Sequence, residues 1–156
     1  MSVLLPGSYD PITVGHLDII KRAAQSEDEV FVVAFINEAK SYRFTERERL
    51  AMLEIATSGI PGVRTDLSHL TVVDYMKEHG IDGIVKGYRD EKDLEWENYQ
   101  AEYNKEHGGF ETVLLQCRAE LAHVSSTLVR RRLDAGEEID DLVSEGVAEF
   151  IQTLKR

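Results

Sequence analysis

Short apolar runs alternate with helical patterns along almost the whole chain. Runs bounded by Gly, Pro and polar residues predict strands at 3–5, 30–36, 63–67, 81–85 and 111–116. Segments with helical spacing predict helices at 15–26, 45–57, 72–79, 91–105, 126–135 and 144–154. Such alternation indicates a parallel sheet with helices on both faces, joined by right-handed crossovers. We therefore expect an α/β fold with a Rossmann-like, doubly wound sheet of five parallel strands.

Local signals support these boundaries. Thr45 and Glu48 form a capping box at a helix start, and Gly80 ends the helix that precedes it. The unbroken apolar run 30–36 is typical of a strand that is covered on both faces. No linker, repeat or low-complexity stretch divides the 156 residues. We expect one domain over residues 1–156.

The composition limits the partners. A net charge of −11 disfavours nucleic acid as a partner. No apolar run is long enough to span a bilayer, so we expect no membrane partner. The single cysteine, Cys117, cannot form an intrachain disulfide, which is compatible with a reducing cytoplasm. A small anionic ligand remains possible where cations gather, and the candidates are Lys40, Arg43, Lys86, Arg89, Lys92, Arg130, Arg131 and Arg132.

The most informative segment, Pro6–His16, lies between the first expected strand and the first expected helix and reads PGSYDPITVGH. A loop in this position can direct backbone amides at an anion near the positive end of the helix. Gly7 and Gly15 leave room for close approach, and His16 stands at the helix start. The alternative is an ordinary turn, because Gly, Asp and Pro all favour turns. The combination of these residues in a strand–loop–helix context favours a phosphate-binding loop.

Two further groups follow expected strands. Lys40 comes after the second strand, on a segment that we expect at the mouth of the same cleft. Lys86, Gly87 and Arg89 come after the fourth strand and offer a point charge, a close backbone approach and a planar guanidinium. The acidic residues that follow, Asp93, Glu95 and Glu97, can orient these cations or reach a base or hydrated metal. Alternatively, they form the solvated first turn of a helix.

A third group comes after the last strand, where Ser125, Ser126 and Thr127 stand at a helix start. Hydroxyls in this position are ordinary helix caps, and they also make a good anion cradle. Ligands of doubly wound sheets bind beyond the carboxyl ends of the strands, where the strand order reverses. We therefore expect all these groups to meet in one cleft.

Taken in order, these motifs resemble the bacterial phosphopantetheine adenylyltransferases of the nucleotidyltransferase superfamily. The resemblance rests on Pro6–His16, Lys40 before Phe44–Arg49, Lys86–Arg89 with Asp93–Glu97, and Ser125–Val129. It implies transfer of the adenylyl group of ATP to 4′-phosphopantetheine, which yields dephospho-coenzyme A and pyrophosphate. It also implies Mg²⁺ that arrives with ATP, and a cytoplasmic homo-oligomer, typically a hexamer.

The resemblance assigns roles to individual residues. The catalytic residues would be Ser8, His16 and Lys40, and His16 would stabilise the transition state at the α-phosphate. The acceptor would contact Ser8, Lys40, Val72 and Lys86. ATP would contact Ser8, Tyr9, His16, Gly87, Tyr88, Arg89, Glu97, Ala122, His123, Val124, Ser125, Ser126, Thr127 and Leu128.

The chain departs from the family pattern, and we expect the departures to gather in the acceptor pocket. They are Lys86 for the usual arginine, Thr71-Val72 for an apolar pair, Tyr103-Asn104 for Met-Asn, Arg131 for an acidic residue, and Leu121-Ala122-His123 before the serines. Three readings stay open. The acceptor is 4′-phosphopantetheine; or the chain is a related nucleotidyltransferase with another phosphate-bearing acceptor or with cytidylyl transfer; or it is a non-catalytic nucleotide-binding paralogue. The serine run is also similar to that of nicotinate or nicotinamide mononucleotide adenylyltransferases.

Overall fold

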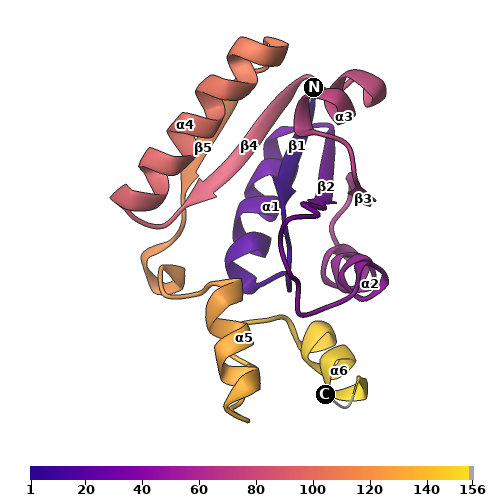
Figure 1. The fold of residues 1–156 in the computed structure, drawn as a ribbon, viewed down its shortest axis with the longest axis vertical. Helices are drawn as coiled ribbons and strands as arrows, with labels where there is room; N and C mark the ends of the chain where they lie inside the picture. The colour runs from indigo at the N-terminus through magenta and orange to yellow at the C-terminus, as the bar shows by residue number, and fades with distance from the viewer. Residues whose placement is uncertain (155–156) are drawn as a thin grey trace.

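The computed structural model describes residues 1–154 and contains one sheet of five parallel strands (Figure 1). The strands are β1 (Ser2–Gly7), β2 (Glu29–Phe35), β3 (Val63–Ser68), β4 (Gly83–Tyr88) and β5 (Thr112–Gln116). Their order across the sheet is β3-β2-β1-β4-β5, so the direction of winding reverses between β1 and β4. This arrangement confirms the expected doubly wound α/β fold.

The helices also follow the expectation closely. They are α1 (Val14–Ser26), α2 (Glu46–Thr57), α3 (Val72–His79), α4 (Glu91–Gly108), α5 (Ser126–Asp134) and α6 (Glu145–Thr153). A 3₁₀ turn, η1 (Ala119–Leu121), was not expected from the sequence. The strand β4 was expected at 81–85, but it begins at Gly83 and continues to Tyr88.

The core has two layers because neighbouring strand residues face opposite sides of the sheet. Val3 and Leu5 pack into a cluster that includes the buried apolar residues of α1, α2, α5 and α6. Leu4, between them, packs with Tyr75 and Met76 of α3 on the other face. The central strands are therefore buried on both sides, as the unbroken apolar pattern predicts.

The strands β1 and β4 separate towards their carboxyl ends. The β1–β4 pairing includes only Val3↔Gly83 and Leu4↔Ile84, whereas the β1–β2 pairing continues to Gly7↔Ala34. Figure 1 shows β4 diverging from β1, with α4 alongside β4 and β5. The sheet thus opens at the point where the strand order reverses, which is where ligands of such sheets bind.

Candidate active site

A cleft of about 330 Å³ lies at the separated ends of β1 and β4. Its walls come from the end of β1 with the following loop, the start of α1, the end of β4, the first turns of α4 and the start of α5. The motifs after the first, fourth and fifth strands therefore meet in one place, as the sequence predicts. Lys40, which was expected at the same cleft, does not line it.

His16 lies in this cleft in a defined protonation state. Its Nδ1 accepts a hydrogen bond from the backbone N–H of Thr13 at 2.9 Å, so the proton of the neutral imidazole is on Nε2. Burial, together with the smaller effect of the charges of Lys86 and Arg89, lowers the pKa of His16 to about 4. The ring of Tyr9 packs edge-on against the imidazole, 4.9 Å between centroids. His16 is therefore a neutral, oriented hydrogen-bond donor at neutral pH.

Tyr9 contributes through its position in the loop. It is the one described non-glycine residue with a positive φ, at 47°. Its side chain is buried, and its hydroxyl donates a hydrogen bond to the Leu5 carbonyl at 2.8 Å. Burial raises the pKa of this phenol well above its usual range. The Tyr9 side chain lines the cleft, and its hydroxyl holds the loop.

The opposite wall carries two ion pairs. Lys86 Nζ lies 3.2 Å from Oε2 of the buried Glu97, and Arg89 Nε lies 2.9 Å from Asp93 Oδ2. Burial raises the pKa of Glu97, and the nearby Lys86 opposes this effect. Both cations line the cleft, so each can exchange its carboxylate partner for a phosphate oxygen.

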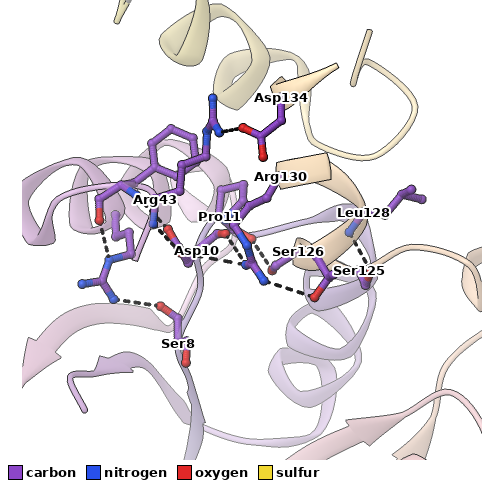
Figure 2. A network of polar contacts seen from close by, with 12 residues as sticks. Ser8, Asp10, Pro11, Arg43, Ser125, Ser126, Leu128, Arg130 and Asp134 are labelled. Atoms are coloured by element: carbon purple, nitrogen blue, oxygen red, sulfur yellow. Dashed lines mark hydrogen bonds and ion pairs between the residues drawn. The ribbon is translucent and has the colours of Figure 1, made fainter. Parts of the chain in front are cut away.

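The start of α5 forms the third wall. Ser125 caps this helix by accepting a hydrogen bond from the Leu128 backbone N–H at 3.0 Å. Ser126 donates to the Pro11 carbonyl at 2.7 Å, and this contact joins the helix to the loop after β1 (Figure 2). The positive end of α5 therefore faces the same cleft as His16.

A second cavity of about 900 Å³ adjoins the first. It is lined by Lys40 and Val72 and by the α4 residues Trp96, Tyr99 and Tyr103. Both cavities are lined by Pro6, Gly7, Ser8, Lys86 and Glu97. Ser8 and Lys86 therefore stand at the boundary, with His16 on one side and Lys40 on the other.

The structure brings most of the predicted site residues to these cavities. The first is lined by Ser8, Tyr9, His16, Gly87, Tyr88, Arg89, Glu97, Val124, Ser125 and Ser126. All four predicted acceptor contacts, Ser8, Lys40, Val72 and Lys86, line the second. Four predicted ATP contacts, Ala122, His123, Thr127 and Leu128, line neither cavity. Ala122 and His123 are exposed after the unforeseen η1, and Thr127 and Leu128 lie within the first turn of α5.

Two expectations need correction. The departures from the family pattern were expected to gather in one pocket, and Thr71, Val72, Tyr103 and Asn104 do line the second cavity. Leu121 lines the first cavity instead, and Ala122, His123 and Arg131 line neither. Of the eight candidate cations, Lys40, Lys86 and Arg89 line one or both of these two cavities, and the other five line neither. Arg43, Arg130 and Arg132 instead contact Asp134, Asp10 and Asp141. The sequence alone does not distinguish arginines that pair with carboxylates of the same chain from arginines that are available to a ligand.

Sequence reasoning gave no role to Asp10, Thr13 and Arg49. All three are buried, and each forms hydrogen bonds within or to the loop after β1. The sequence does show that these positions hold polar residues, and a buried Asp or Arg requires a polar partner. It does not show which residue is that partner, because the partner is known only from the fold.

Within residues 1–154, no group of three or more His, Cys, Asp or Glu side chains is arranged to hold a metal ion. Over the same residues, no helix combines the length and apolarity needed to cross a membrane.

Comparison with known proteins agrees with the geometry. Residues 4–132 match the Cytidylyltransferase-like family. The fold is similar to the crystal structure of a protein assigned as a nicotinate-nucleotide adenylyltransferase from Vibrio parahaemolyticus, with a TM-score of 0.70, 14% identity and 97% coverage of both chains. The protein is thus an enzyme of the nucleotidyltransferase class.

A phosphopantetheine adenylyltransferase from Symbiobacterium thermophilum is 42% identical over 144 residues, which are 92% of this chain and 89% of that protein. This chain belongs to the phosphopantetheine adenylyltransferase family.

Proposed function

We propose that this enzyme transfers the adenylyl group of ATP to 4′-phosphopantetheine, which yields dephospho-coenzyme A and pyrophosphate. The observation that carries the proposal is the junction of the two cavities at Ser8 and Lys86. A nucleotide in the cleft of His16 and an acceptor phosphate beside Lys40 would approach each other at this junction. The name of the 42% identical relative supports the same reaction.

The reaction is a direct in-line displacement. An oxygen of the acceptor phosphate forms a bond to the α-phosphorus, and the bond from that phosphorus to the α–β bridging oxygen breaks. Pyrophosphate leaves with the electron pair of that bond. The acceptor phosphate is already anionic, so the step needs no general base, and catalysis consists of positioning and charge stabilisation.

His16 supplies the donor at the reacting phosphate. Its Nε2–H would donate to an α-phosphate oxygen whose negative charge grows in the transition state. Ser8 and Lys86 would hold the acceptor at the boundary, with Lys40 on the acceptor side. Arg89 and the start of α5 would hold the leaving pyrophosphate.

Mg²⁺ would enter as part of the MgATP substrate, held by triphosphate oxygens, because this ion often binds through substrate phosphates. The lining of the second cavity suits an acceptor that carries a phosphate and a partly apolar arm. Its phosphate would contact Lys86, and its arm would lie along Val72 and the aromatic residues of α4. Thr71, Tyr103 and Asn104 would contact the same arm.

The direct test measures pyrophosphate release with ATP or CTP and a panel of acceptors: 4′-phosphopantetheine, nicotinate mononucleotide and glycerol 3-phosphate. We expect release with ATP and 4′-phosphopantetheine, at a kcat/KM at least about a hundredfold above every other pair. Faster turnover of another pair would assign a different nucleotidyl transfer. ATP binding without release from any pair would indicate a nucleotide-binding paralogue.

We also propose that the enzyme acts in the cytoplasm as a homo-oligomer, by analogy with its family. Light scattering on the purified protein is expected to give the mass of a hexamer of the 17.7 kDa chain. A monomeric mass would contradict this.

A further inference from the structure

Lys40 lies on an exposed loop, and the segment that carries it is attached to the loop after β1 by two buried charged side chains. We call residues 37–44, between β2 and α2, the Lys40 segment. The part of this segment nearest α2 contacts the loop after β1 through Asp10 and Arg49 (Figure 2).

Asp10 makes the first attachment. Its side chain is 3% exposed, Oδ2 accepts from the Arg43 backbone N–H at 2.9 Å, and Oδ1 accepts from the Phe44 N–H at 3.0 Å. Arg130 donates to the Asp10 carbonyl at 2.8 Å and places its guanidinium 3.9 Å from Oδ2. Both carboxylate oxygens thus have partners, which a buried charge requires.

Arg49 makes the second attachment with the opposite charge. Only 1% of this residue is exposed. Its Nε donates to the Phe44 carbonyl, and its Nη1 donates to the Ser8 carbonyl, both at 3.2 Å. A single planar guanidinium therefore connects the loop after β1 to the end of the Lys40 segment.

Tyr42 extends this connection towards Lys40. The Arg49 guanidinium lies over the Tyr42 ring, 4.0 Å from its centroid. The Tyr42 hydroxyl accepts a hydrogen bond from the Asn37 backbone N–H at 2.9 Å and so closes the segment into a loop. Lys40 lies within this loop, with Nζ 5.9 Å from the centroid of the same ring.

We propose that Asp10 and Arg49 are positioning residues that set the place of Lys40 relative to Ser8 at the boundary of the two cavities. This inference rests on the proposed function, in which Lys40 acts on the acceptor side of that boundary. A long lysine side chain on an irregular segment has many accessible conformations. Its contribution to the rate therefore depends on how firmly the backbone that carries it is held in place. Asp10 and Arg49 hold that backbone without contacting the substrates.

The test is a double-mutant cycle between Asp10→Asn and Lys40→Ala. The Asn side chain keeps one oxygen that can accept a hydrogen bond, but its NH₂ group replaces the other oxygen. One of the two hydrogen bonds from the Arg43 and Phe44 backbone N–H groups is therefore lost. We expect D10N to lower kcat about tenfold or more, since small displacements of a catalytic group are costly. The Kd for ATP should stay within about twofold, because His16, Arg89 and Ser125 are unchanged. In the K40A background, D10N should change kcat by less than about twofold, because the lysine side chain that Asp10 positions is then absent.

Asp134→Asn is the matched control, because Asp134 forms an ion pair with Arg43 of the same segment and is itself exposed. We expect D134N to keep kcat within about twofold of the wild-type value. ATP-binding stoichiometry gives the fraction of folded sites in every variant. If D10N does not fold, the same cycle with Arg49→Lys decides, since lysine keeps the charge but cannot make both contacts and stack on Tyr42.

The inference is overturned if the D10N and K40A effects multiply in the double variant, or if D10N weakens ATP binding as much as it lowers kcat. Failure of the proposed function would have a different result, because the wild-type enzyme would then form no dephospho-coenzyme A.

Discussion

His16 Nδ1 lies 2.9 Å from the backbone nitrogen of Thr13, and the Thr13 hydroxyl in turn accepts a hydrogen bond from the His16 backbone N–H at 3.3 Å. This reciprocal pair is a capping box in which histidine takes the place usually held by Glu or Gln. A glutamate there would add negative charge where the proposed function places the α-phosphate. The imidazole completes the same cap and still has an N–H to donate.

The first prediction concerns the protonation of His16. Its pKa of about 4 lies below the ordinary value of 6.5, so the imidazole is neutral at pH 6 with the proton on Nε2. Because the unfolded chain binds this proton more readily, the contribution of His16 to stability is complete above pH 6.5 and is lost as the pH falls towards 4. Nitrogen NMR of the imidazole checks both statements. A charged ring at pH 6, or a proton on Nδ1, would contradict them.

The second prediction concerns Gly87, where β4 passes α1. A Cβ at this position would lie 2.7 Å from Ile19 Cγ1 and 3.1 Å from its Cδ1, and Ile19 is buried. We expect Gly87→Ala to lower the free energy of unfolding by about 1–3 kcal/mol, measured by urea denaturation. In an Ile19→Ala background the same change should cost little, because the new methyl group enters the vacated space.

Gly59→Ala is the control for Gly87, because no atom of a residue other than its chain neighbours lies within 4 Å of its Cβ position. It should change the free energy of unfolding by less than about 1 kcal/mol. Equal effects at positions 59 and 87 would show that the cost is a general one of replacing glycine.

The third prediction concerns the pair between Lys86 and Glu97. Burial raises the pKa of Glu97, so the charged carboxylate destabilises the fold at neutral pH, and Lys86 offsets part of this cost. Lys86→Ala should lower stability at pH 7 by about 1–2 kcal/mol, a moderate value because Lys86 is partly exposed. The loss should shrink as the pH falls and Glu97 becomes protonated, and Glu97→Gln in the same chain should restore most of it. A loss that is independent of pH would contradict this account.

The sequence predicted the sheet, the six helices and the site of the cleft because these follow from local patterns. Hydrophobic periodicity marks the elements, and alternation of strands with helices implies parallel order. The loop Pro6–His16 could be assigned because a strand, glycines and a helix start are all visible within a short stretch.

The connections inside the site could not be predicted, because they join residues that are distant in the chain. Arg130 contacts Asp10 across 120 positions, and Arg49 contacts Ser8 across 41. Arg130 looks like a phosphate ligand in the sequence, since nothing local distinguishes a cation that binds a ligand from one that holds a loop. The exposed Ala122 and His123 follow η1, which has three residues and is too short for hydrophobic periodicity to reveal it.

The most direct measurement of the central claim compares turnover with ATP binding in His16→Ala. If His16 acts on the α-phosphate in the transition state, kcat should fall about a hundredfold or more while the Kd for ATP stays within about threefold. Equal losses in kcat and in ATP affinity would show instead that His16 only binds the nucleotide, and would contradict the account.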